Sequence, residues 1–401
     1  MTTAQQMRQW AGPALFSYGF RPFFLFGALW AALAMLLWIM MLTGWANLPM
    51  RLDAVSWHAH EFLFGYLGAV VAGFLLTAVP NWTGRLPVVG WRLAGLFALW
   101  GLGRIGIAFS ALIPAPLPEL LDLLFPILLA GLILREIIAG KNWRNLGVLV
   151  LLTLFIVANL TFHIEASSGA NAARGFGLRL GVGSVLMMIS LIGGRIIPSF
   201  SRNWMVTAGK KDLPVPPMQR FDKVTLMLSV VGLILWVVWP QSPQAAAAMS
   251  VIGVLHLLRL WRWKGHHTMP EPLVLVLHLG YLFVPLGALA TGLAIMQPAL
   301  LASGTAQHLW MAGAFALMSL GVMTRATLGH TGQEVKAGTG SLALFLCVLG
   351  SVICRISAGF WPDAASVFYV LAGLFWSAAF AGFVLLYGRL LLGVRASMPR
   401  P

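Results

Sequence analysis

Residues 57–79, WHAHEFLFGYLGAVVAGFLLTAV, decide how this chain folds, because they join titratable side chains to a long apolar run. From residue 62 onward the run contains no charge, and its length predicts a helix that crosses a membrane. Ionisable groups at the edge of hydrocarbon need partners, so His58, His60 and Glu61 are predicted to form part of a functional site. The alternative is that they anchor the helix end among lipid headgroups. Since two positions on a helix are about 200° apart, either the two histidines face different partners or the first turn of the helix is irregular.

The composition fits only a membrane protein. Of the 401 residues, 59% are hydrophobic and 9% are charged, against roughly 25% charged in soluble domains. The formal charge of +15 reflects basic residues spread among loops, and no basic tract with interleaved aromatics suggests nucleic acid. We therefore expect the lipid bilayer, and no nucleic acid, as a partner.

Twelve apolar runs are long enough to cross a bilayer, and glycine, proline and charged clusters separate them. The approximate spans are 22–43, 57–79, 91–112, 117–139, 146–166, 176–197, 223–240, 244–264, 272–296, 304–325, 340–361 and 365–391. No fixed-period repeat is visible. The sequence thus predicts an all-α polytopic membrane protein in which residues 1–401 form a single transmembrane domain.

The distribution of lysine and arginine predicts the orientation. Most of the 26 fall at the two ends of the chain and in alternate connections, whereas the opposite connections hold only Arg51 and Arg174. By the positive-inside rule both termini are cytoplasmic. Three arginines lie inside the outer half of predicted spans: Arg104, Arg179 and Arg355. Arginines at that depth suggest anionic partners such as Glu61, Glu165 or the carboxylates of a cofactor.

Seven of the nine histidines fall into two layers on this topology. The outer layer contains His58, His60, His163 and His308. The cytoplasmic layer contains His256, His278 and His330. A single intramembrane histidine is usually a hydrogen-bonded packing residue, but two layers suggest metal or haem ligands.

The motifs that the sequence lacks restrict the kinds of cofactor that it can bind. The sequence has no Cys-x-x-Cys-His for covalent haem, no set of cysteines for an iron–sulfur cluster and no His-Glu-x-x-His for a zinc protease. A non-covalent b-type haem and a histidine-ligated metal such as copper remain. An open ligand position on either would bind a small gas.

Five motifs in chain order resemble the NnrS family and extend over most of the chain. They are Tyr18-Gly-Phe-Arg-Pro-Phe-Phe24, Trp57-His-Ala-His-Glu61, Phe74-Leu-Leu-Thr-Ala-Val-Pro-Asn-Trp-Thr-Gly84, Gly193-Gly-Arg-Ile-Ile-Pro-Ser-Phe200 with Arg202-Asn203, and Met323-Thr-Arg-Ala-Thr-Leu-Gly-His-Thr-Gly332. The resemblance implies a twelve-span protein of the bacterial inner membrane, associated with haem and copper and with the response to nitric oxide. Whether nitric oxide is bound, sensed or reduced stays open.

Three site predictions follow. One or two of the outer histidines are expected to hold a haem b whose propionates pair with the intramembrane arginines. The cytoplasmic histidines are expected to hold a second haem or a metal. If the protein is an enzyme, it is an oxidoreductase that couples two nitric oxide molecules to nitrous oxide with an unknown electron donor. Glu61 would then carry protons, or instead orient a ligand histidine.

Two other classes of function compete with this interpretation. One is a transporter that moves an anion or a proton with its intramembrane histidines and arginines. The other is an assembly factor that binds haem without turnover. A haem spectrum of the purified protein separates the transporter from both others.

Overall fold

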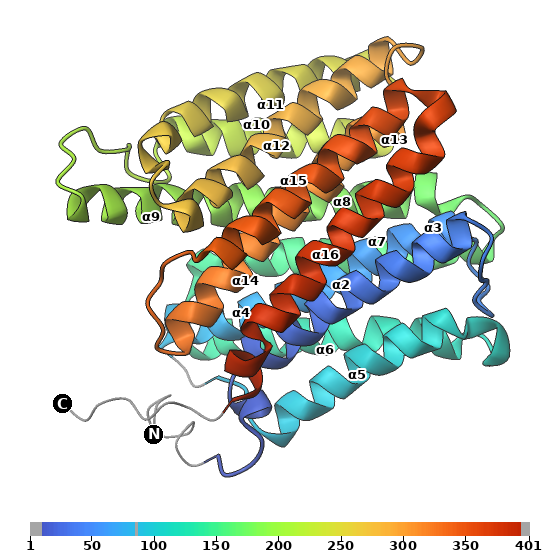
Figure 1. The fold of residues 1–401 in the computed structure, drawn as a ribbon, viewed down its shortest axis with the longest axis horizontal. Helices are drawn as coiled ribbons and strands as arrows, with labels where there is room; N and C mark the ends of the chain where they lie inside the picture. The colour runs from blue at the N-terminus through green and yellow to red at the C-terminus, as the bar shows by residue number, and fades with distance from the viewer. Residues whose placement is uncertain (1–9, 85–86, 394–401) are drawn as a thin grey trace. The chain divides into compact units, whose positions relative to one another are not determined.

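All regular secondary structure in the part of the chain that the structure describes, residues 10–84 and 87–393 of a computed structural model, is helical. Twelve helices of membrane length are counted among these described residues, which confirms the predicted all-α class, and Figure 1 shows how the helices run. Nine of them are continuous: α2 (Phe20–Leu42), α5 (Trp91–Ala108), α6 (Leu117–Ala139), α7 (Leu146–Ser167), α10 (Arg220–Val238), α11 (Pro243–Trp261), α12 (Pro272–Met296), α15 (Thr339–Phe360) and α16 (Ala365–Leu392).

The other three spans each contain a π-helical segment. They are α3 (Ala54–His60), η2 (Glu61–Tyr66) and α4 (Leu67–Thr83); α8 (Phe176–Met188), η6 (Ile189–Gly193) and α9 (Gly194–Thr207); and α13 (Ser303–His308), η8 (Leu309–Phe315) and α14 (Ala316–His330). These are the second, sixth and tenth spans, so the interruption recurs although the sequence shows no fixed-period repeat. Segments of this kind are frequent at functional sites.

Short 3₁₀ helices lie in the connections. They are η1 (Ala14–Ser17), η3 (Ser110–Leu112), η4 (Trp143–Asn145), η5 (Ala172–Arg174), η7 (Gly265–Thr268) and η9 (Pro362–Ala364).

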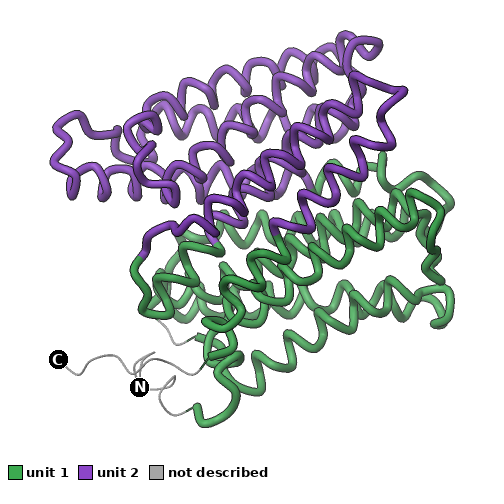
Figure 2. Tube along the Cα trace, in the orientation of Figure 1, with its two compact units in different colours: residues 1–181, 323–334, 380–401 green, residues 182–322, 335–379 purple. Residues whose placement is uncertain are grey.

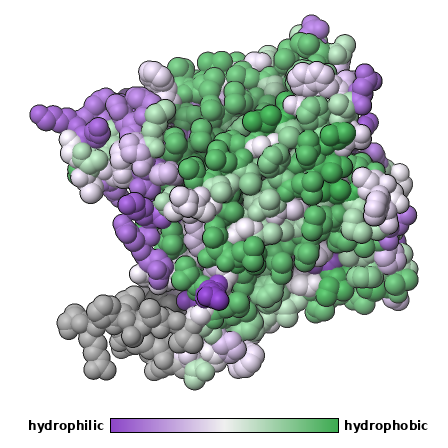
Figure 3. Space-filling model, in the orientation of Figure 1, coloured by the Kyte–Doolittle hydropathy of each residue, from purple (hydrophilic) through white to green (hydrophobic). Residues whose placement is uncertain are grey.

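Length and hydropathy make this a multi-pass membrane protein. Eleven helices of the described residues are long and apolar enough to cross a membrane. Helix α5 is not apolar enough, because Arg92 and Arg104 lower its mean hydropathy. Large apolar side chains such as Ile127, Val231 and Ile353 are exposed. Figure 3 shows apolar residues along the sides of the helices and hydrophilic ones mainly near their ends. Such a surface suits lipid. The cytoplasmic placement of the termini stays a prediction, and both ends lie outside the described residues.

Local sequence sets several helix ends. The Asp53 carboxylate accepts the backbone N–H groups of Val55 and Ser56, both at 3.0 Å, and so begins α3. Gln219 and Asp222 form a capping box at the start of α10. The sixth span continues to Thr207, beyond its predicted end at residue 197, and contains Pro198.

The chain divides into two compact units (Figure 2). Unit 1 comprises residues 1–181, 323–334 and 380–401, and unit 2 comprises residues 182–322 and 335–379. Aromatic side chains fill both interiors. Phe23, Trp57 and Phe162 are buried in unit 1, and in unit 2 the rings of Trp236 and Trp310 meet edge to face at 5.3 Å. The predicted single domain stays a prediction.

Candidate metal centre

The junction between α3 and η2 places His60 and Glu61 in the interior of unit 1. Both side chains are fully buried. The His60 Nδ1 atom lies 3.0 Å from Glu61 Oε1, so an N–H there donates to the carboxylate. The His58 ring instead stacks on Trp38 with centroids 4.5 Å apart. The two histidines therefore serve different partners, as the helix geometry predicts.

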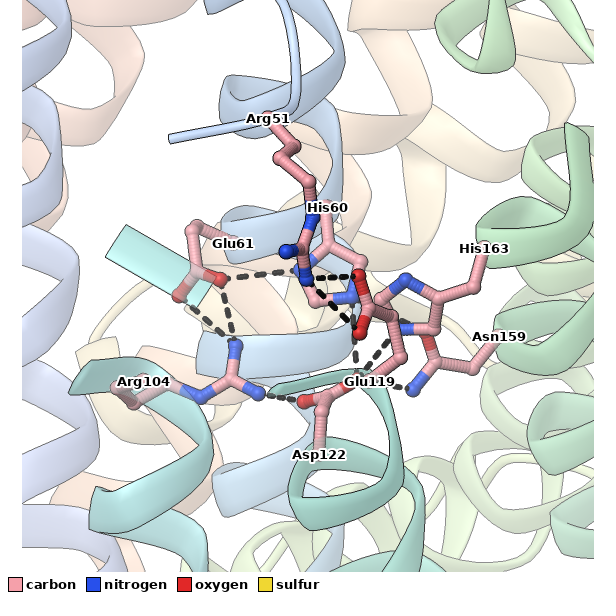
Figure 4. Close-up of polar contacts among 8 residues, drawn as sticks. All are labelled: Arg51, His60, Glu61, Arg104, Glu119, Asp122, Asn159 and His163. Atoms are coloured by element: carbon pink, nitrogen blue, oxygen red, sulfur yellow. Dashed lines mark hydrogen bonds and ion pairs between the residues drawn. The ribbon is translucent and has the colours of Figure 1, made fainter. Parts of the chain in front are cut away.

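Asp122 of α6 is the centre of a polar cluster (Figure 4). Its Oδ2 atom lies 3.2 Å from His60 Nε2 and 3.0 Å from His163 Nε2, and it accepts a 2.7 Å hydrogen bond from Asn159 Nδ2. His163 and Asn159 come from α7, one helical turn apart. Three elements of unit 1 thus bring two imidazoles and a carboxylate together, all buried.

Arg104 of α5 joins both carboxylates. Its Nη1 atom lies 2.8 Å from each oxygen of Glu61, and its Nη2 atom donates to Asp122 Oδ1. Trp30 Nε1 adds a 2.8 Å hydrogen bond to Glu61 Oε2. The guanidinium lies against Gly65, where a Cβ would come within 2.5 Å of Nη1. Glycine at this position is what allows the arginine to approach the helix.

The cluster has an excess of one negative charge when both imidazoles are neutral, because among the described residues Arg104 is the one permanent cation that contacts Glu61 and Asp122. The surroundings of the His60 ring also indicate that a positive charge is missing. Its Nδ1 faces a Glu61 oxygen, and its Nε2 faces oxygens of Asp122 and Asn159, at 3.2 and 3.1 Å. A neutral imidazole has one N–H and one lone pair and cannot satisfy acceptors on both sides. The site therefore requires a further proton or a metal cation.

The donor atoms suit a small metal ion. His60, Asp122 and His163 each offer one ligand atom, and these atoms lie within 4.8 Å of one another. Donors bonded at about 2 Å to one ion lie about 3 Å apart, which matches the observed nitrogen to oxygen distances of 3.0 and 3.2 Å. Asp122 would bind through Oδ2 and keep Oδ1 for Arg104.

A haem does not fit between these two histidines. The ring centroids of His60 and His163 are 4.8 Å apart, and Asp122 Oδ2 contacts the Nε2 atoms of both rings. A porphyrin plane would have to pass through that position to receive both imidazoles as axial ligands.

Other residues predicted for the outer site make contacts of their own. His308 contacts the Gly304 carbonyl oxygen of its own helix at 2.6 Å in unit 2. Arg179 donates to the Arg174 carbonyl at 2.6 Å. Arg355, in unit 2, lies over the Tyr369 ring at 4.9 Å. Of the seven predicted cofactor ligands, the structure brings together His60, His163 and Arg104.

The histidines predicted for the cytoplasmic site are divided between the units. His330 belongs to unit 1, where its ring stacks on Tyr18 at 5.5 Å. His278 in unit 2 bonds Ser201 at 2.7 Å through Nε2, and His256 bonds Ser229 at 2.9 Å and Tyr281 at 2.7 Å. A joint metal site of all three stays a prediction.

Unit 2 has a buried charged cluster that the sequence interpretation missed. Arg259 is fully buried; its Nε donates to Asp222 at 2.7 Å, and its Nη1 to the Ser190 carbonyl and the Tyr281 hydroxyl at 2.8 and 2.9 Å. Because the Ser229 hydroxyl donates to the Thr225 carbonyl at 2.7 Å, it accepts from an N–H at His256 Nε2, and the neutral His256 ring accepts the Tyr281 proton at Nδ1. Both His256 nitrogens are then used, and the charges of Arg259 and Asp222 balance.

The main omission was Asp122. It is a carboxylate inside the predicted span 117–139, so the rule that flagged Glu61 could also have flagged Asp122. Asn159 is likewise a polar residue in a predicted span. Nothing in the sequence alone indicates that these residues meet His60, since they are remote along the chain.

The comparison with known families agrees with the motifs. Residues 14–395 match the family model described as NnrS protein. The chain belongs to the NnrS family. No curated protein matches it. Membership of the NnrS family indicates a membrane protein of the nitric oxide response, and the buried His60, Asp122 and His163 group allows it to bind a metal.

Proposed function

We propose that this NnrS family member binds a transition metal ion through His60, Asp122 and His163, and that nitric oxide binds at this metal. The observation that carries the proposal is the buried cluster in which both His60 nitrogens face oxygens and two carboxylates share one arginine. A bound cation removes the excess charge. The family resemblance makes copper the expected ion and the bacterial inner membrane the expected location.

The donor set supports this chemistry. Two imidazoles and one carboxylate are ligands that copper, iron and zinc accept, and three protein ligands leave positions open. When bound, the ion would supply such an open position to nitric oxide. The chain's own residues would exclude bulk water, because the three ligands and Glu61 are buried.

Glu61 is better placed to orient His60 than to carry protons. One Glu61 oxygen accepts a hydrogen bond from His60 Nδ1, the other accepts one from Trp30 Nε1, and both contact Arg104 Nη1. The carboxylate is therefore held by partners on several sides. Fixing the proton of His60 on Nδ1 directs the Nε2 lone pair toward Asp122, as carboxylates behind metal-bound histidines commonly do. Reduction of nitric oxide and the predicted haem b stay predictions.

The test is metal content of the protein purified in lipid nanodiscs and loaded anaerobically with copper, iron or zinc. We expect one ion per chain in the wild type and a loss of most of it in His60→Ala, Asp122→Asn and His163→Ala. His58→Ala is the matched control, because its ring stacks on Trp38 and the grouped donor atoms come from His60, Asp122 and His163. A wild type without bound metal, or full loading of all three variants, contradicts the proposal.

Nitric oxide binding is measured on the same samples. We expect a new metal–nitrosyl spectrum in the loaded wild type and in His58→Ala, and none in the three ligand variants. The visible spectrum before loading also shows whether haem is present, which separates the transporter alternative from the haem-binding ones.

A further inference from the structure

A buried metal site needs a route by which the ion arrives. His60 and Glu61 are fully buried, and Asp122 and His163 are nearly so. Glu119 precedes Asp122 by three residues in α6, and Figure 4 shows it with its partner Arg51. The Glu119 and Arg51 side chains are 25% and 35% exposed, so both reach the surface of the protein.

Glu119 and Asp122 share one face of α6. They are three residues apart at the start of this helix, a spacing that places both side chains on the same side, one turn apart. Glu119 also interacts electrostatically with His163, which contacts Asp122 Oδ2 at 3.0 Å. A carboxylate at the surface is thus followed, one turn deeper, by the carboxylate of the proposed site.

Arg51 occupies the surface carboxylate. Its Nη2 atom lies 2.9 and 3.2 Å from the two Glu119 oxygens, and its Nη1 donates to the Ile113 carbonyl at 2.9 Å. Partly exposed ion pairs contribute little to stability, so a metal cation can replace the guanidinium at this carboxylate.

We propose that Glu119 is the entry site at which a metal cation is first captured on its way to Asp122, and that Arg51 competes with the cation for this carboxylate. The inference rests on the proposed metal centre. It assigns the pair a role in the rate of loading and none in the final coordination. The alternative is that the pair is only a brace between the connection that precedes α3 and the start of α6.

The two roles predict different effects of the substitutions on the rate of copper(II) uptake. For an entry site, Glu119→Gln removes the capturing charge and slows copper(II) uptake on the order of tenfold, as lost electrostatic steering does. Arg51→Gln removes the competing cation and speeds uptake. For a brace, both substitutions remove the same contact and change the uptake rate in the same direction or not at all.

The experiment uses metal-free full-length protein in nanodiscs, mixed with copper(II) and quenched with a chelator at increasing times before metal analysis. The matched controls are Asp363→Asn and Arg174→Gln, two exposed charges in connections predicted on the same side of the membrane. Thermal midpoints of all variants confirm folding.

We expect slower uptake in Glu119→Gln, faster uptake in Arg51→Gln, wild-type rates in both controls and unchanged final copper content throughout. A wild type that takes up no ion overturns the proposed function, and this inference with it. A wild type that loads, with Glu119→Gln loading at the same rate or both variants shifted in one direction, overturns the entry site alone.

Discussion

At the scale of single residues, Glu61 decides whether the cluster needs a cation. Glu61→Gln keeps the side-chain shape but removes one of two carboxylates, so Asp122 and Arg104 then balance without a metal. We expect copper affinity to fall about 10- to 100-fold, as for other carboxylates that orient metal-bound histidines. Titration of the metal-free protein measures it.

The control for this variant is Glu165→Gln. Glu165 accepts the backbone N–H groups of Phe176 and Gly177, at 2.6 and 3.1 Å, and lies outside the cluster. Its removal should leave copper affinity unchanged. If Glu61→Gln keeps full affinity but loses nitric oxide turnover, Glu61 is a proton carrier and the orienting role is wrong.

Single residues were partly predictable. The sequence identified His60, Glu61, His163 and Arg104 because each is a polar group within an apolar run. It could not rank them above His308 or Arg355, since depth along a helix does not specify the face that a side chain occupies. Arg259 lies near the end of α11, where an arginine usually reaches the membrane surface, although the structure buries it fully.

At the scale of elements, the π-helical segment η2 positions the site. Gly65 lies within it, and a Cβ there would meet Arg104 Nη1 at 2.5 Å and Glu61 Oε2 at 2.8 Å. Gly65→Ala must therefore displace the ion pair. We expect a loss of about 1–3 kcal/mol in stability, typical of overpacking, together with weaker copper binding. Chemical unfolding and copper titration measure the two effects.

Gly68 of α4 provides the matched control in the same span. A Cβ at Gly68 would have its nearest neighbour, Phe155, at an ordinary 4.0 Å. Gly68→Ala should keep wild-type stability and copper affinity. Equal behaviour of the two alanine variants would show that the close approach of Arg104 to η2 has no energetic consequence.

The helices themselves follow from hydropathy, whereas their irregularities do not. Long apolar runs predict spans because the bilayer leaves the backbone no other way to satisfy its hydrogen bonds. The π segments and the extension to Thr207 past Pro198 depend on neighbouring helices, such as the Trp100 side chain that donates to the Gly65 carbonyl at 3.0 Å. A single sequence does not contain that information.

At the scale of the whole molecule, each unit contains a buried charged cluster, and the two differ in charge. In unit 2 the Arg259 and Asp222 charges balance, whereas in unit 1 Arg104 faces both Glu61 and Asp122. The balanced pair is expected to stabilise the fold without a ligand. The unbalanced cluster is expected to gain stability only when a cation binds.

Matched substitutions in the two clusters test this difference. In metal-free protein, Asp222→Asn leaves Arg259 buried without a counter-charge, and we expect a loss of about 3–5 kcal/mol. Asp122→Asn removes a negative charge from a cluster that has one too many, so the loss of stability should be smaller than in Asp222→Asn. Copper at 100 times its dissociation constant should then stabilise the wild type and Asp222→Asn by about 2.7 kcal/mol and leave Asp122→Asn unchanged. Unfolding midpoints with and without copper measure these effects, and equal stabilisation of Asp122→Asn would place the bound ion outside unit 1's cluster.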